Sequence, residues 1–462
     1  MRPFLVCLCI PVFTITACQS TTVGTSAPVD QAVEALTLAP AIISPSETPS
    51  PTETATPTVV PAGFIQVDTL EQEVYPFVEN GKCSLAEAIF AANSGQPKDS
   101  CAAGVPDQSI IELMPGEYRF MQRDQTPPQG DWVASTVKVG DALPAVIRSL
   151  TIRGNGATLI REEAAEPFRF FEVMFGTLTL ENLTLQNGDV LDDWGGAIYS
   201  MNASLMLDHV RFVNNHADNG GGFYLTLGGL TVKDSEFVEN RASFAGGGTY
   251  VDSAKAEVIT TTFDGNLANG PGAGLFAENV ALSVEDSLFV RNKTEGTRGG
   301  GLYVRHVNLA VTRSQFYENH AEAYGGGISV NNPIINGTDT SDDDPIDNFE
   351  QLNPLSSEML TMIPGLEATL EAHSSGMFQE LLEAGEIHDS CFANNTTNFE
   401  GDPNWTSAIG GMSEADSNYW GDPSGPSGMG PGTGDNVGKK ITSTPFLTVR
   451  PEYCDLDLSE QR

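Results

Sequence analysis

Hydrophobic and polar residues alternate in short runs through the middle of this chain. Two apolar residues flank one small or polar residue at positions 230–232, 282–284 and 309–311. Each run is followed by a Ser and then a Phe, as at Ser235 and Phe237. A second kind of short apolar run, such as residues 223–225 and 302–304, follows each glycine cluster. Alternation with a period of two, in runs rich in β-branched and aromatic residues, is typical of strands. The pattern therefore predicts two or three strands per repeat.

The same pattern recurs at a nearly fixed period. The repeat is marked by six FxxN motifs, of which the first five Phe residues are separated by 25, 26, 26 and 27 residues. The phenylalanines are Phe212, Phe237, Phe263, Phe289, Phe316 and Phe392, and the asparagines are Asn215, Asn240, Asn266, Asn292, Asn319 and Asn395. Glycine clusters begin at Gly195, Gly220, Gly246, Gly272, Gly299 and Gly325. A period of this size indicates a solenoid.

The fold class that fits is all-β, a parallel β-helix in which each coil stacks on the last at about 4.8 Å. Equivalent residues then form columns along the stack. We expect the Phe column inside the coil and the Asn column at a bend, where side-chain amides can bond from coil to coil. Glycine permits the positive φ of a tight corner. A leucine-rich repeat would need a denser Leu pattern, which the chain does not have.

The net charge of the chain limits the kinds of molecule that it can bind. The chain has 462 residues, with 61 acidic and 23 basic side chains and a formal net charge of -38. This charge repels nucleic acid and anionic membrane surfaces, and no basic patch in the sequence offsets it. We therefore expect no nucleic-acid partner.

The N-terminus has the features of an export signal followed by a stalk. Arg2 precedes an apolar run from Phe4 to Ile15 that is too short to span a bilayer. We assign residues 1–18 to a signal peptide. Residues 19–62, rich in Ser, Thr and Pro, cannot form a core and are expected to be a disordered, extended stalk.

Cysteines suggest two disulfides in the exported part of the chain. Once the signal peptide is excluded, Cys83, Cys101, Cys391 and Cys454 remain. Three pairings are possible, and sequence proximity favours Cys83 with Cys101 and Cys391 with Cys454. Their spacing is not that of a zinc site.

The ends of a solenoid expose an apolar cross-section and need caps. Ser84 and Glu87 have capping-box spacing and start a short helical pattern that we expect to close the N-terminal end. The expected divisions after the stalk are an N-terminal cap with the first coils (63–145), the repeats (146–332), an insertion (333–388), the final coils (389–447) and a C-terminal tail (448–462).

The insertion interrupts the period, since Phe316 and Phe392 are 76 residues apart. Residues 333–388 are acidic and contain apolar positions that predict two short helices. The acidic residues between Asp342 and Asp347 could hold Ca²⁺, but they lack EF-hand spacing and such runs are usually solvated. No cofactor is therefore predicted, with Ca²⁺ as the alternative.

Several segments resemble known families. Residues 81–93, with Cys101 and residues 116–118, resemble the CSLREA module of bacterial surface β-helix proteins, although Ala86 replaces its usual Arg. Residues 195–198 and the FxxN motifs resemble the repeats of polymorphic outer-membrane-protein adhesins, and residues 418–426 are similar to final coils of bacterial right-handed β-helix proteins. The resemblance covers most of residues 75–447 and implies a right-handed coil.

Residues 15–18, Ile-Thr-Ala-Cys, resemble the bacterial lipobox. That resemblance implies that Cys18 is lipidated and anchors an exported protein to the bacterial membrane, displayed outside the cytoplasm. The alternative is an ordinary cleaved signal.

Several common catalytic motifs are absent from the sequence. The histidines show no HExxH spacing, and there is no GxSxG or P-loop motif. The motifs of polygalacturonase-type and pectate-lyase-type β-helices are missing too. We read His216 and His320 as exposed corner residues.

The leading hypothesis is a surface-anchored β-helix lipoprotein for adhesion or binding of glycans or another cell surface, without catalysis. Exposed Tyr and Asn columns could bind sugars. The alternative is an extracellular polysaccharide lyase or glycoside hydrolase, which would need two carboxylates at a fixed separation. A passive spacer in the cell envelope is a third reading.

Overall fold

The structure is a computed structural model that describes residues 62–127, 140–296, 298–331, 385–397, 409–428, 430–437 and 440–454. The expected signal peptide, lipidated Cys18, stalk and acidic cluster at 342–347 lie outside these residues. So do the two helices predicted for the insertion.

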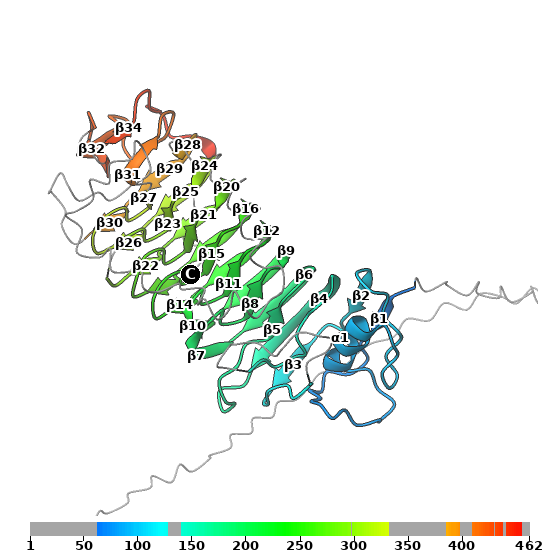
Figure 1. The fold of residues 1–462 in the computed structure, drawn as a ribbon. Helices are drawn as coiled ribbons and strands as arrows, with labels where there is room; N and C mark the ends of the chain where they lie inside the picture. Colours follow the sequence, from blue (N-terminus) through cyan, green and yellow to red (C-terminus); the bar gives the residue numbers. More distant parts are fainter. Residues whose placement is uncertain are drawn as a thin grey trace, which may run out of the picture. The chain divides into compact units, whose positions relative to one another are not determined.

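The described chain forms a parallel β-helix with three faces that run along the stack, which we call sheets 1, 2 and 3 (Figure 1). Sheets 1 and 2 are joined by one strand near the C-terminal end. Sheet 1 contains β1 (Phe64–Gln66), β2 (Ser109–Glu112), β3 (Glu117–Phe120), β4 (Leu150–Arg161), β6 (Thr177–Gln186), β9 (Ser204–Val213), β12 (Gly229–Lys233), β13 (Glu236–Val238), β16 (Lys255–Ile259), β17 (Thr262–Asp264), β20 (Ala281–Glu285), β21 (Leu288–Val290), β24 (Asn308–Thr312), β25 (Gln315–Tyr317), β28 (Gly385–His388), β29 (Cys391–Ala393) and β34 (Lys440–Thr442). The predicted all-β parallel fold is confirmed.

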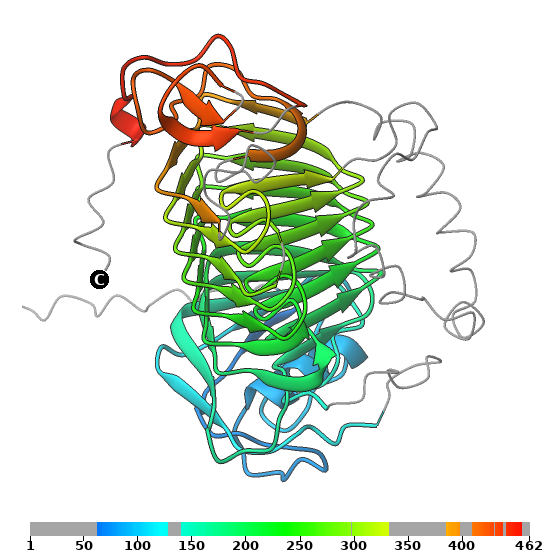
Figure 2. The ribbon, with the colours of Figure 1, turned by 90° about the vertical axis from the view of Figure 1, so that its left-hand side faces the viewer.

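Sheet 2 contains β5 (Phe171–Val173), β8 (Ile198–Met201), β11 (Phe223–Thr226), β15 (Thr249–Asp252), β19 (Leu275–Glu278), β23 (Leu302–Arg305), β27 (Ile328–Asn331), β31 (Ile409–Glu414), β32 (Pro426–Gly428) and β33 (Gly434–Val437). Sheet 3 contains β7 (Asp189–Trp194), β10 (His216–Asn219), β14 (Arg241–Ala242), β18 (Leu267–Ala268), β22 (Lys293–Thr294), β26 (His320–Ala321) and β30 (Thr396–Thr397). From β8 to β31 the chain visits sheets 2, 1 and 3 in turn, so each circuit is one coil (Figure 2).

Phenylalanine rings fill the coil interior behind sheet 1. Phe237 pairs in register with Phe263, and Phe263 with Phe289, on strands β13, β17 and β21. Their ring centroids are 4.7 and 4.6 Å apart, which is close to the spacing of neighbouring strands. All six predicted phenylalanines have no exposed surface: Phe212, Phe237, Phe263, Phe289, Phe316 and Phe392. The column ends on Trp420, whose ring lies 5.1 Å from Phe392.

Asparagine side chains form a hydrogen-bonded ladder beside this column. Asn240 Nδ2 donates to Asn266 Oδ1 at 3.0 Å and to the Phe212 carbonyl oxygen at 2.9 Å. The same Asn266 oxygen accepts the backbone N–H of Asn240. Each amide thus uses both N–H groups and its oxygen, which removes the cost of burying a polar group. The last rung is Asp435, which accepts both bonds from Asn395.

Left-handed residues turn the corners of each coil. At three corners these are mostly polar or charged residues, such as Asn182, Asn187 and Asn279 with φ of 50°, 63° and 53°. The fourth corner takes glycine, and Gly220 has φ 66°. A Cβ at Gly220 would lie 2.1 Å from the Phe223 carbonyl oxygen, so only glycine fits there.

Helix α1 (Leu85–Ser94) lies at the N-terminal end of the stack. Ser84 and Glu87 form the predicted capping box, and Gly95 ends the helix in the left-handed conformation. The buried disulfide between Cys83 and Cys101 joins the segments on either side of the helix, as sequence proximity predicted.

The second predicted disulfide, Cys391 to Cys454, joins β29 to the 3₁₀ turn at Glu452–Cys454. Although 76 residues separate Phe316 from Phe392 in sequence, their rings stack at 5.1 Å. The inserted residues therefore leave the column intact. The predicted end of the insertion at 388 is too late, because Gly385–His388 forms β28 and pairs with β24.

We predict that Phe263→Ala lowers the free energy of unfolding by about 3–5 kcal/mol, because it leaves a cavity in the interior column. Chemical denaturation followed by circular dichroism measures the change. Thr262→Ala is the matched control, since Thr262 is the half-buried neighbour on the same strand that points outward. Equal stability of the two variants would contradict an interior column.

Candidate functional site

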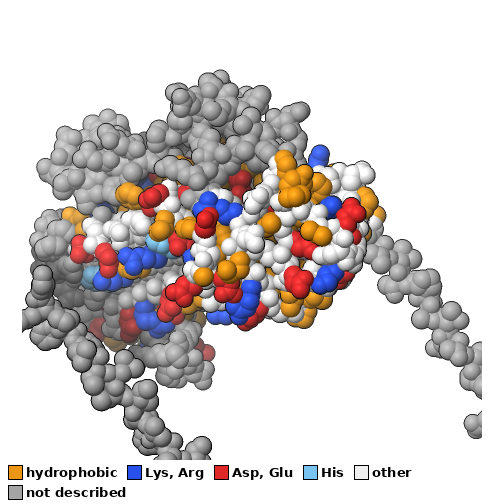
Figure 3. Space-filling view, turned by 90° about the horizontal axis from the view of Figure 1, so that it is seen from below, with side chains coloured by type: hydrophobic (Ala, Val, Ile, Leu, Met, Phe, Trp, Pro, Cys, Tyr) orange, Lys and Arg blue, Asp and Glu red, His pale blue; other side chains and the backbone are white. Residues whose placement is uncertain are grey.

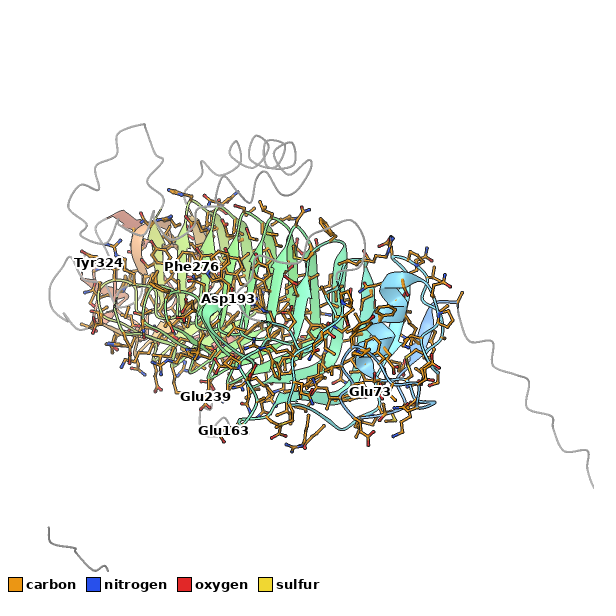
Figure 4. All side chains as sticks on the ribbon, turned by 60° about the horizontal axis from the view of Figure 1, so that its bottom comes forward. Glu73, Glu163, Asp193, Glu239, Phe276 and Tyr324 are labelled. Atoms are coloured by element: carbon orange, nitrogen blue, oxygen red, sulfur yellow. A yellow bond between two sulfur atoms is a disulfide. The ribbon has the colours of Figure 1, made fainter. Side chains whose placement is uncertain are left out.

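The outer face of sheet 2 carries a row of aromatic side chains that we call the aromatic row. Its members occupy equivalent positions on five successive strands and are Tyr199, Tyr224, Tyr250, Phe276 and Tyr303. Neighbouring ring centroids lie between 4.3 and 5.8 Å apart. Trp194 stacks on Tyr224 at 5.0 Å. Phe276 is labelled among the side chains in Figure 4.

A second row, the polar row, runs beside the aromatic row on the same face. It contains the last residues of β11, β15, β19, β23 and β27, which are Thr226, Asp252, Glu278, Arg305 and Asn331. Asp252 and Glu278 are direct register partners on adjacent coils. Their exposed fractions are only 4% and 8%. The face therefore places two nearly buried acidic residues side by side on strands about one strand spacing apart.

The two carboxyl groups have different neighbours. Glu278 accepts a hydrogen bond from Arg305 Nε at 2.8 Å and from the Tyr250 hydroxyl at 3.2 Å. Asp252 accepts bonds from the hydroxyls of Thr226 at 3.2 Å and Ser253 at 2.9 Å. Glu278 therefore contacts the charged guanidinium of Arg305, whereas the two hydroxyl donors to Asp252 are neutral.

Burial governs the pKa values in this cluster. It raises the pKa of Asp252, the charge of Glu278 raises it further, and hydrogen bonds from neutral side chains oppose the shift. Burial also raises the pKa of Tyr250 well above its ordinary value. For Arg305, burial alone would lower the pKa, but the Glu278 charge and hydrogen bond raise it overall. Perturbed carboxyl groups of this kind occur both in active sites and in structural ion pairs.

A related buried network lies at the start of the same face. Arg169 has no exposed surface and bonds Asp193 at 2.8 Å, while its Nε lies 3.1 Å from Asp141. Its guanidinium carbon is 5.3 Å from the centre of the Tyr199 ring. Burial, followed by the charge of Glu172, raises the pKa of Asp141 well above its usual value. This network joins the first coils to the aromatic row.

The structure corrects the expected sugar-binding columns. The asparagines of the ladder are 0–3% exposed, and the aromatic row is 2–7% exposed. In addition, the ring faces of the aromatic row cover one another, so only ring edges and hydroxyls remain for other contacts. Neither column is an exposed sugar-binding surface as the sequence suggested.

Histidines differ from the sequence reading as well. His216 and His320 are half-buried rather than exposed. His216 Nδ1 lies 3.3 Å from an Asp189 oxygen, and His320 Nδ1 lies 2.8 Å from the Thr396 hydroxyl. These rings bridge adjacent coils of sheet 3.

One other cluster brings potential metal ligands together. Ligand atoms of Asp208, His209 and Asp234 lie within 4.8 Å of one another at an exposed corner of sheet 1. Exposed acidic groups commonly lie this close without a metal, and Asp208 already bonds His209 at 2.6 Å. The cluster follows from the stacking of polar residues at the same corner of successive coils.

Sequence reasoning identified the strands of sheet 2 but missed the polar row. The signal was present, because each strand after a glycine cluster ends on a polar residue in β11, β15, β19 and β23. Only the register shows that these residues align.

Comparison of the chain with protein-family models and with curated proteins finds no match. Among the helices of the described ranges, none has the length and apolar character needed to cross a membrane.

We predict that Asp252→Asn changes how stability depends on pH. The pKa of Asp252 is raised in the folded state, so its favourable contribution is present below the unfolded value near 3.8 and is lost as pH rises through the folded pKa. The free energy of unfolding of the wild type should therefore fall, relative to the variant, as pH rises from about 4 towards 7. Denaturation at several pH values measures this difference. Glu163→Gln, at an exposed carboxyl, is the control, and a pH-independent difference for Asp252→Asn would refute the prediction.

Proposed function

We propose that this chain is an exported, lipid-anchored β-helix that binds glycans or another cell surface without catalysis. The lipobox-like residues 15–18 and the Ser/Thr/Pro-rich stalk support anchoring through Cys18 and display away from the membrane. The closed ladders inside the coil support a stiff scaffold, since each coil is fixed to the next by buried hydrogen bonds.

One observation carries the binding proposal: sheet 3 presents a row of side chains with one residue from each coil. We call this the sheet 3 row, and its members are His216, Arg241, Leu267, Lys293, His320 and Thr396. All six are half-buried or exposed. A row with one contact per coil suits a ligand that itself repeats, because each added contact strengthens the others.

The charges around the row favour neutral or zwitterionic glycans. Lys293 lies 3.8 Å from Glu295, and His216 lies 3.3 Å from Asp189. On the face seen in Figure 3, basic and acidic side chains are interspersed. A polyanionic chain would meet acidic groups there, in a protein whose net charge is -38.

Binding of purified residues 63–462 to a glycan array tests this proposal. We expect a set of related glycans to bind, and Arg241→Ala with Lys293→Ala to weaken that binding about tenfold or more, because hydrogen bonds from charged groups are lost. Lys233→Ala with Lys255→Ala removes the same charges from sheet 1 and is the matched control.

Two results would count against the sheet 3 row. If the protein binds no glycan and no cell-surface material, the proposed function is wrong. If both double variants lose binding equally, the binding surface lies outside the sheet 3 row.

A polysaccharide hydrolase is the second candidate, and the Asp252–Glu278 pair favours it. Retaining glycosidases place two carboxyl groups about 5–5.5 Å apart, one as acid and one as nucleophile. Asp252, with its raised pKa, would be the proton donor, and Glu278, held by Arg305, the nucleophile. The low exposure of both groups makes this candidate second, because a substrate would have to reach them.

Incubation with a panel of polysaccharides, with and without Ca²⁺, decides between the candidates. The binding proposal predicts no shortened products. If the chain is a hydrolase, shortened products appear, and Asp252→Asn lowers the rate about 10²–10⁴-fold, the usual contribution of a general acid. Glu278→Gln removes the nucleophile and should also lower the rate. Glu257→Gln on sheet 1 should leave any such rate unchanged.

A further inference from the structure

A second outward row lies beside the sheet 3 row. In β10, β14, β18, β22 and β26 the residue after the sheet 3 row has no exposed surface, as for Ala242 and Ala268. The residue after that points outward again, because side chains alternate along a strand. Pairing between coils continues to this position, since the Ser243 N–H donates to the Ala217 carbonyl oxygen at 2.9 Å. We call these outward residues the acidic row: Asp218, Ser243, Asn269, Glu295 and Glu322.

The two rows carry opposite charges. From His216 to Thr396 the sheet 3 row contains basic and neutral side chains and no carboxyl group. The acidic row contains three carboxyl groups and no basic side chain. The rows lie two residues apart along each strand, which is about 6.6 Å. Charges of opposite sign are therefore separated into two parallel lines that follow the stack.

Arg241 is the clearest binding group of the sheet 3 row. It is exposed and forms no ion pair within the described ranges, whereas most lysines and arginines there do, such as Arg211 and Lys255. The chain has 61 acidic and 23 basic side chains, so a carboxylate partner is rarely lacking. The planar guanidinium presents donors in a fork that matches a carboxylate. Arg241 is therefore open to an anionic group of a ligand.

The acidic row offers carboxylates to a cationic group in the same way. Glu322 is half-buried and has no ion pair with any residue that the structure describes. Glu295 lies 3.8 Å from Lys293, and their side chains are 46% and 52% exposed. Exposed pairs of this kind contribute little to stability, so a ligand can replace either partner. Both carboxylates can thus accept a ligand ammonium group.

We propose that sheet 3 recognises zwitterionic glycans, which are chains that carry both carboxylate and ammonium groups. Arg241 and Lys293 bind the carboxylates, and Glu295 and Glu322 bind the ammonium groups. A purely anionic chain meets repulsion from the acidic row, and a purely cationic chain meets it from the sheet 3 row. This inference rests on the proposed function and narrows its class of ligand.

Four forms of one polysaccharide test the inference on the full chain. The first is a polymer of alternating glucuronic acid and glucosamine, which is zwitterionic. The others have the amines acetylated, the carboxyl groups reduced to alcohols, or both changes. Surface plasmon resonance at about 0.15 M salt measures binding while screening distant charges. We expect the zwitterionic form to bind at least about tenfold more tightly than each of the others, because they lose charged hydrogen bonds.

Substitutions in each row assign the charges. Arg241→Gln should weaken binding of the zwitterionic form to about the level of the carboxyl-reduced form. Glu295→Gln with Glu322→Gln should weaken it to about the level of the acetylated form. Lys255→Gln with Glu257→Gln removes an exposed ion pair between residues i and i+2 of sheet 1, and this matched control should change nothing. Circular dichroism checks that each variant is folded.

The possible failures are distinguishable. If all four forms bind equally, or a singly charged form binds best, the inference is wrong and glycan binding itself stands. If none of the four binds, the inference is also wrong, and the glycan array decides the proposed function separately. If the sheet 1 control removes the preference for the zwitterionic form, recognition lies on another face and the assignment to sheet 3 is overturned.

Discussion

The fold depends on exact repetition of one hydrogen-bonded arrangement, the asparagine ladder. Each ladder amide satisfies a backbone N–H and a carbonyl from the neighbouring coil as well as the next amide, as Asn266 does between Asn240 and Asn292. A shift of one residue would leave these buried groups unpaired and would turn the phenylalanines outward. The ladder therefore fixes the register, and the register aligns every other row on the surface.

That register explains why the interior tolerates little change while the exterior carries varied chemistry. Inside, the phenylalanine column runs unbroken from Phe212 to Phe392, and the glycine corner admits no Cβ. Outside, the same stacking aligns different residues on each sheet: aromatic and acidic on sheet 2, mixed charges on sheet 3, and apolar residues on sheet 1 beneath residues 447–454. A binding function fits such a scaffold, because rows on separate faces can differ without disturbing the core.

The sequence predicted the repeating elements well because they rest on local periodicity. The FxxN spacing, the glycine clusters and the capping box at Ser84 each specify backbone geometry within a few residues. The polar row was missed because Asp252 and Glu278 are 26 residues apart and become neighbours only when coils stack. The insertion boundary was misplaced for a similar reason, since β28 is defined by pairing with β24.

By itself the sequence determined the parallel β-helix, the inward phenylalanines and the acidic character, because period, side-chain volume and charge are properties of the chain. Tertiary structure decided which of three disulfide pairings forms, that Asp435 completes the ladder, and that the tyrosines lie buried. These outcomes depend on distances between coils and on what packs against each face. Such distances exist only after the chain has folded, when residues far apart in sequence are brought within a few ångströms.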